Sequence, residues 1–169
     1  MAEEPGEIAI LPPLMTAVGD MTLTSERLAC LRDGLTKRGV QAMLVSGEQD
    51  VRFIAGCFGH DTRILVTPDR AALVSDRRYE EYLAPWEEDG CFELAIHNRP
   101  AQIEYIGQVL ADEGLRELGV QAGHLTLEAR DGLSAQLKDT ELVPISGLLA
   151  HLRMRKSPEE IETIERAIA

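Results

Sequence analysis

The strongest constraint on the fold is a pair of short apolar runs separated by a turn. The runs cover residues 63–66 and 71–74, and Thr67-Pro68-Asp69-Arg70 lies between them. Proline fixes φ near the value that a turn needs, and an aspartate side chain can bond its own backbone. This spacing therefore predicts a β-hairpin, and with it a sheet that contains an antiparallel pair of strands.

Segments of helix and strand character alternate along the rest of the chain. Helices are expected at 25–38, 48–54, 77–84, 100–112, 127–138 and 147–155, and strands at 40–46, 92–97, 119–122 and 141–143. Thr24 is placed to cap the first helix, and Pro85 to end the third, since proline disfavours the helical region for the residue before it. Such alternation is typical of an α/β layered domain, and the hairpin makes its central sheet mixed.

The last segment predicts an amphipathic helix with a strong start signal. Ser157 and Glu160 have the spacing of a capping box, and Pro158 occupies the first helical position. Three isoleucines then recur at helical spacing and define an apolar face. A face of this kind usually packs on another element.

Length and charge favour a single globular domain. The 169 residues can bury one proper core but are few for two domains of typical size. The formal charge of −12, from 17 basic and 29 acidic residues, argues against a nucleic-acid surface, which needs clustered Lys and Arg. No run of about 18 apolar residues is present, so no membrane span is expected.

Cysteine usage and the first residues indicate the compartment. Cys30, Cys57 and Cys91 are odd in number, far apart and without a C-x-x-C pair, so no disulfide framework is expected. The apolar segment 8–18 follows acidic residues where a signal peptide would carry positive charge, so secretion is not expected. A reducing, cytoplasmic location is the simplest interpretation.

No pattern in the sequence predicts a catalytic centre. A two-metal hydrolase site needs several carboxylates, and usually a histidine, that converge on one cavity. The four histidines, His60, His97, His124 and His151, are scattered and show neither H-x-H nor H-E-x-x-H spacing. A G-x-S-x-G elbow for a nucleophilic serine is also missing. We therefore predict no catalytic residue and no metal ligand in this chain.

Several short motifs occur in a fixed order. DVRFIAG stands at 50–56, DRRY at 76–79, LGV at 118–120, LTL at 125–127 and LRMRKSPEEI at 152–161. In this order they resemble the N-terminal domain of the creatinase, prolidase and aminopeptidase P family, over about residues 25–169. The first is similar to the family's N-x-x-Y-L-x-G, with Asp50 in place of Asn and Phe53 in place of Tyr. DRRY matches its D-x-R-Y, and the last resembles its L-R-x-x-K-S-x-x-E-I junction.

The resemblance implies a fold and a domain organisation. The family's N-terminal domain is an α/β three-layer sandwich, with a mixed central β-sheet flanked by helices and a ribonuclease H-like motif. Residues 1–22 would then be an extension, 23–156 the domain itself, and 157–169 the start of a linker helix to a catalytic domain that this chain lacks. In the family, that catalytic domain holds two divalent metal ions such as Mn, Co or Zn.

The resemblance also implies a function. Family members are metallopeptidases that act at Xaa-Pro bonds, together with creatinase. On this basis we expect a non-catalytic domain that serves homodimer formation and restricts access to the active site of the full-length parent, so that short proline-containing peptides enter. A stand-alone binding module and a fragment of a creatinase-like amidinohydrolase stay open as alternatives.

The loop at 56–63 is the predicted substrate contact. In relatives this loop reaches the active site of a neighbouring subunit, so Phe58, His60 and Arg63 are predicted to line a partner's pocket, with Arg63 holding a substrate carboxylate. The alternative is a solvated loop in which Arg63 pairs with Asp61 or Asp76.

The DRRY motif has two interpretations of its own. One is subunit contact or gating of the site. The other is a helix start that Asp76 caps, with Tyr79 packed against the edge of the sheet.

Overall fold

A computed structural model describes residues 21–57 and 59–168. The helices are α1 (Met21–Thr36), α2 (Glu48–Ala55), the 3-10 helix η1 (Arg77–Tyr79), α3 (Glu80–Glu88), α4 (Arg99–Asp112), α5 (Leu127–Gln136), α6 (Leu148–Met154) and α7 (Pro158–Ile168). The strands are β1 (Ala42–Val45), β2 (Arg63–Val66), β3 (Ala71–Ser75), β4 (Glu93–Ile96), β5 (Glu117–Gln121) and β6 (Glu141–Ile145).

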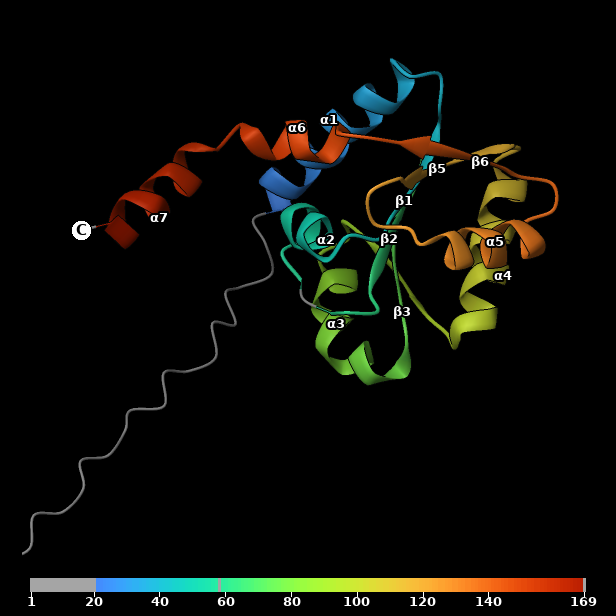
Figure 1. Ribbon diagram of the computed structural model, residues 1–169. Coiled ribbons are helices and arrows are strands. Elements are labelled where there is room, and N and C mark those ends of the chain that lie inside the picture. Colours follow the sequence, from blue (N-terminus) through green and yellow to red (C-terminus); the bar gives the residue numbers. More distant parts are fainter. Residues whose placement is uncertain (1–20, 58, 169) are drawn as a thin grey trace, which may run out of the picture.

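In the described residues, six strands form one mixed sheet in the order β4-β3-β2-β1-β5-β6 (Figure 1). β2 runs antiparallel to both β1 and β3, whereas β1 with β5, β5 with β6, and β3 with β4 are parallel pairs. The predicted hairpin is β2–β3, with Arg63 opposite Val74 and Val66 opposite Ala71. The mixed sheet is therefore confirmed.

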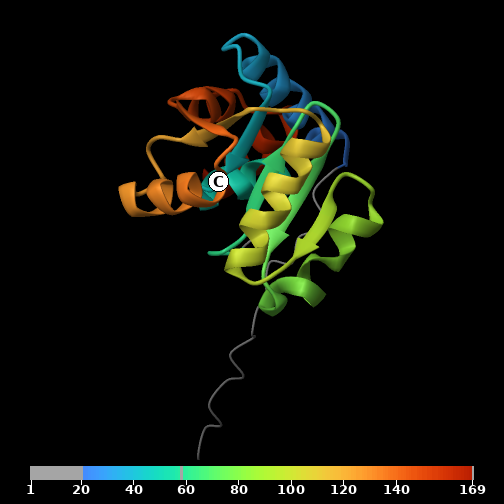
Figure 2. The same ribbon diagram turned by 90° about the vertical axis from the view of Figure 1, so that its right-hand side faces the viewer.

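Helices cover both faces of the sheet and give the three layers that were predicted. On one face α1, α2, α3 and α6 bury a cluster that includes Leu31, Ile54 and Trp86. On the other face α4 and α5 bury a second cluster, which includes Ile106 and Leu133, and Figure 2 shows α4 lying along this face. Each such side chain contributes about 1.5–3 kcal/mol by leaving water, so the two clusters fix the layers.

The predicted start of the first helix is wrong. α1 already begins at Met21, so Thr24 lies inside the helix, where it is 4% exposed, instead of capping it. Thr22 also belongs to α1, while residues 1–20 of the predicted extension lie outside the described residues. The division of the chain at residues 22 and 156 stays a prediction.

The predicted stop at Pro85 is also wrong, because α3 continues through this residue to Glu88. An interior proline costs a helix about 3 kcal/mol through a lost hydrogen bond and a steric clash. The residues around it offset this cost: Leu83 is fully buried, and Trp86 is 6% exposed and donates from Nε1 to the Ala55 carbonyl at 2.6 Å. Tertiary packing around Pro85 therefore outweighs the tendency of proline to end a helix.

The capping box at the start of α7 is confirmed. The Ser157 N–H donates to Glu160 Oε2 at 2.9 Å, and the Glu160 N–H donates to Ser157 Oγ at 3.2 Å. Glu160 also pairs through Oε1 with Arg27 Nη2 of α1 at 3.0 Å, which ties the first turn of α7 to the domain. Beyond that turn α7 leads away from the body of the domain (Figure 1), and Ile161 and Ile168 are 46% and 80% exposed.

No helix in the described part of the chain is long and apolar enough to cross a bilayer.

All three cysteines are free. Burial raises the pKa of the Cys57 thiol to about 12, so this side chain is a neutral core residue at pH 7.

Candidate functional site

The loop between α2 and β2 is shaped by two glycines. α2 ends at Gly56, whose φ of 72° lies in the left-handed region that glycine adopts without strain. At Gly59 a Cβ atom would lie 2.3 Å from Thr62 Oγ1, so no other residue fits without a shift. Thr62 Oγ1 is in turn bonded to Ser75 Oγ at 2.9 Å in a buried position, which pins the loop to the end of β3. These contacts fix the end of α2 and the described residues 59–62 that lead into β2.

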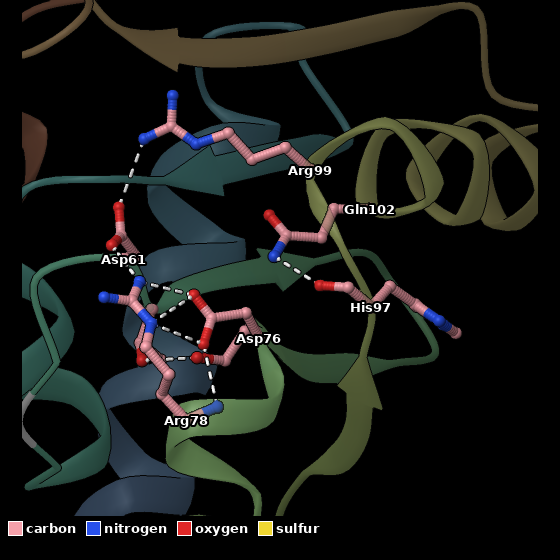
Figure 3. Close-up of polar contacts among 8 residues, drawn as sticks. Asp61, Asp76, Arg78, His97, Arg99 and Gln102 are labelled. Carbon is pink, nitrogen blue, oxygen red and sulfur yellow. Dashed lines mark hydrogen bonds and ion pairs between the residues drawn. The ribbon is translucent and has the colours of Figure 1, made fainter.

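A carboxylate on this loop holds two arginines from other elements (Figure 3). Asp61 Oδ2 lies 2.5 Å from Arg78 Nη2, and Asp61 Oδ1 lies 3.2 Å from Arg99 Nη2. Arg78 also bonds Asp76, with Nε 3.0 Å from Oδ1 and Nη2 2.6 Å from Oδ2. The cluster thus joins the loop, the start of η1 and the start of α4.

Local capping positions both of these arginines. Asp76 accepts a hydrogen bond from the Arg78 N–H at 2.9 Å, which confirms that it caps the helix start, and the half-buried Tyr79 packs against the core. At α4, the Asn98 side chain accepts from the Ala101 N–H. Gln102 of α4 is buried and donates to the His97 carbonyl at 2.9 Å (Figure 3).

The ion pairs shift the acid–base behaviour of the cluster. The hydrogen bond from Arg78, and then that from Arg99, lower the pKa of Asp61 against a partly opposing effect of burial. Hydrogen bonds from Arg78 also lower the pKa of Asp76. The same contacts raise the pKa of Arg78, so the cluster keeps its charges well into the acid range.

Arg63 stands beside this cluster without a partner. It begins β2, where its backbone pairs with Val74 of β3, and it is half-buried, but its side chain makes no hydrogen bond or ion pair with any described residue. Burial and the nearby Arg99 lower its pKa, and Asp61 opposes them in part. The alternative pairing of Arg63 with Asp61 or Asp76 is wrong, because Arg78 and Arg99 occupy those carboxylates. A free guanidinium fork of this kind can take an incoming carboxylate through two hydrogen bonds.

The other two predicted substrate contacts are only partly defined. The His60 side chain is 82% exposed, and its Nδ1 lies 3.1 Å from Glu48 Oε2. Phe58 lies outside the described residues. No hydrogen bond or ion pair between described residues joins His60 to Arg63, so the roles of all three residues stay predictions.

A second polar cluster was not predicted from the sequence. Gln121 is 5% exposed, and its Oε1 accepts from the N–H groups of Ser46 and Gly47, both at 2.7 Å. Its Nε2 donates to Asp50 Oδ2 at 2.6 Å, and Arg153 Nη1 lies 3.2 Å from Asp50 Oδ1. The one available signal was Asp50 itself, which replaces the Asn of the resembled motif. The partners of Asp50, which are Gln121 and Arg153, lie far from it in the sequence, and no local sequence pattern marks them.

Among residues 21–57 and 59–168, no group of three or more His, Cys, Asp or Glu side chains is placed to hold a metal ion. The carboxylates of both clusters are instead engaged with arginine or glutamine. Both clusters are therefore networks of ion pairs and hydrogen bonds.

The family is identified by comparison with known proteins. The model of the creatinase/prolidase N-terminal domain matches residues 27–155, and the chain therefore belongs to this family. Over 141 residues it is 30% identical to the uncharacterized peptidase YqhT of Bacillus subtilis, a match that covers 83% of this chain and 39% of that protein. The chain thus spans about two fifths of the length of this curated relative.

Solved structures share the fold. The Xaa-Pro dipeptidase from Bacillus anthracis superposes with a TM-score of 0.73 at 25% identity, over 82% of this chain and 38% of that one. The N-terminal domain of the cytoplasmic peptidase PepQ from Mycobacterium tuberculosis superposes with a TM-score of 0.66 at 30% identity, over 76% of this chain and 98% of that one. The α/β fold is therefore that of creatinase/prolidase N-terminal domains.

Proposed function

We propose that this chain is the non-catalytic N-terminal domain of a cytoplasmic Xaa-Pro metallopeptidase of the aminopeptidase P or prolidase type. Its tasks are homodimer formation and restriction of access to the active site. The family match and the likeness to an Xaa-Pro dipeptidase support the class of the parent enzyme. The observation that carries the site is Arg63, a half-buried guanidinium without a partner among the described residues.

In this proposal the loop at 56–63 lines the active site of the neighbouring subunit. Arg63 binds the carboxylate of a short proline-containing peptide, while Phe58 and His60 form the wall beside it. Asp61 acts as a positioning residue, because it holds Arg78 and Arg99 and so leaves Arg63 unpaired. The loop would thereby close one side of the pocket, which excludes long or folded substrates.

Hydrolysis itself belongs to the catalytic half of the parent. There, two divalent metal ions such as Mn, Co or Zn would supply a hydroxide nucleophile at neutral pH. The residues of this chain supply substrate binding and orientation, which converts binding energy into a productive geometry. We therefore expect their loss to change KM for charged substrates more than it changes the chemical step.

Kinetics of the full-length parent test the role of Arg63. Arg63→Ala should raise KM for Ala-Pro by about tenfold or more, because one charge-assisted pair is lost, while KM for the amide Ala-Pro-NH2 should hardly change. Arg116→Ala, at an exposed position remote from the loop, is the matched control. An equal effect of Arg63→Ala on the acid and the amide, or no effect on either, would exclude the carboxylate role.

Subunit complementation tests the contribution across the dimer. One population of the parent carries Arg63→Ala with intact metal ligands, and the other carries an inactivated metal site with Arg63 intact. If Arg63 serves the neighbouring subunit, mixed dimers regain wild-type KM in the sites that contain metal. If mixing restores nothing while dimers exchange, Arg63 does not act across the interface.

A further inference from the structure

A cavity lies where the carboxyl ends of three parallel strands meet. After β1 the chain turns to α2 on one face of the sheet, and after β5 it turns to α5 on the other face. Adjacent parallel strands with diverging connections leave a crevice, and α/β proteins bind ligands there. Here the crevice holds a cavity of about 190 Å³, whose lining includes Met43, Asp50, His124, Ser146, Leu148 and Arg153.

The carboxylate of Asp50 is the buried charge of this cavity. The residue is 3% exposed, and Oδ2 accepts from Gln121 Nε2, while His124 Nε2 lies 3.7 Å from it. Oδ1 receives no hydrogen bond from any described residue. Arg153 Nη1 is its ion partner at 3.2 Å but makes its hydrogen bond to Gln49 Oε1 at 3.0 Å. A buried oxygen with unused acceptor capacity requires an explanation, and a ligand N–H is one.

Charge balance selects the class of ligand. Asp50 and Arg153 give the cavity one carboxylate and one guanidinium, and the imidazole of His124 lies beside the carboxylate. A simple anion would leave the buried carboxylate uncompensated, and a simple cation would leave the guanidinium without its partner. A zwitterion satisfies both, with its ammonium on Asp50 Oδ1 and its carboxylate on Arg153. Asp50 Oδ1 is closed to solvent and paired with Arg153, so ligand binding requires the Arg153 side chain, which is 34% exposed, to turn from Asp50 to the ligand carboxylate.

Size and lining narrow the class further. A volume of about 190 Å³ has room for about six water-sized groups, well below the size of a drug-like ligand or a peptide. The apolar part of the lining comes from Met43, Ile145, Leu148 and Leu149. The cavity therefore matches a free α-amino acid with a small apolar side chain, such as alanine or proline.

We propose that the crevice at the ends of β1, β5 and β6 binds a small free α-amino acid between Asp50 and Arg153. The site belongs wholly to this chain and lies on elements other than the loop at 56–63. Its occupancy would stiffen the contact between α2 and α6, the helices that carry Asp50 and Arg153.

Titration of the purified chain followed by amide NMR tests this proposal. L-Alanine and L-proline should bind saturably with half-saturation on the order of 1 mM, and should shift the amides of Gly123, His124, Ser146 and Gly147. Acetate and ethylammonium, each with one of the two charges, should bind at least about tenfold more weakly. If no amino acid shifts these amides, or if acetate binds as well as alanine, the proposal fails.

Variants locate the site. Arg153→Gln and Asp50→Asn should each weaken alanine binding by about tenfold or more, whereas Arg116→Gln, an exposed control, should leave it unchanged. Circular dichroism verifies the fold of each variant, and Arg153 provides the decisive one because it is partly exposed. Binding that survives in folded Arg153→Gln would place alanine elsewhere and overturn the assignment.

Discussion

The two carboxylate–arginine clusters of this domain differ in one physical respect that decides their roles. The pair Asp61–Arg99 and the pair Asp50–Arg153 have the same 3.2 Å separation, yet the side-chain exposures of the two aspartates are 31% and 5%. Near the surface, water screens an ion pair and makes it worth little, whereas a buried pair is costly to break because a charge is left behind. Equal distances therefore do not imply equal contributions to stability.

The two aspartates also differ in the partners that they bind. Asp50 is bonded to an amide, Gln121, that also accepts from two backbone N–H groups, so it forms part of the packing of the sheet. Asp61 is shared between two arginines with exposed side chains, 66% for Arg78 and 77% for Arg99. The buried cluster thus holds the fold, and the surface cluster arranges charges around the free Arg63.

The largest effect is expected at the buried cluster. Gln121→Leu keeps the volume but leaves the N–H groups of Ser46 and Gly47, and Oδ2 of Asp50, without their hydrogen bonds. We expect a loss of about 3 kcal/mol in the free energy of unfolding, measured by urea denaturation. Gln136→Leu, at an exposed position in α5, should stay within about 0.5 kcal/mol of wild type. Similar values for the two variants would show that Gln121 does not hold the fold.

A smaller effect is expected from the loop that carries the surface cluster. Gly59→Ala places a Cβ atom 2.3 Å from Thr62 Oγ1, so the buried Thr62–Ser75 bond must give way, at a cost of about 1–2 kcal/mol in unfolding free energy. Gly132→Ala, in α5 where a Cβ atom meets nothing within 4 Å, should instead raise stability by about 0.5–1 kcal/mol. If Gly59→Ala leaves the free energy of unfolding unchanged, the Thr62–Ser75 hydrogen bond does not hold the loop to β3.

The smallest effect is expected at Asp61. Asp61→Asn should lower the unfolding free energy at pH 7 by about 0.5 kcal/mol, because exposed ion pairs contribute little. The pKa of Asp61 is lowered in the folded protein, so its contribution is complete above the ordinary value of about 3.9 and is lost as pH falls through the lowered value.

Urea denaturation between pH 7 and pH 2.5 checks this prediction. The gap between wild type and Asp61→Asn should stay constant down to about pH 4 and then close. Asp139→Asn, which removes an exposed carboxylate, is the control. A gap that widens toward low pH would show that Asp61 is not stabilised by its arginines.

Local signals allowed much of the fold to be predicted. The turn at Pro68 and Asp69 predicted β2–β3, and the spacing of Ser157 and Glu160 predicted the start of α7, because both depend on neighbours within a few residues. The continuation of α3 through Pro85 depends on Trp86 bonding Ala55, 31 residues away. A contact between residues that far apart cannot be predicted from a local sequence pattern.

The candidate site shows the same limit. Arg63 could be named from its loop, but the alternative in which it pairs with Asp61 or Asp76 is wrong, because Arg99 binds Asp61 from 38 residues away and Arg78 binds both carboxylates. Gln121 and Asp50 are 71 residues apart, and a glutamine that ends a strand has no signature. Tertiary proximity alone decides which charges pair.

We predict that this chain supplies contacts and not catalysis. The most direct test of this prediction is a peptidase assay of the purified 169-residue chain with Ala-Pro and added Mn²⁺ or Co²⁺. We predict a rate no higher than that of the metal ion alone at any concentration of the chain. Cleavage that rises in proportion to the concentration of the chain and disappears on addition of a chelator would contradict this prediction.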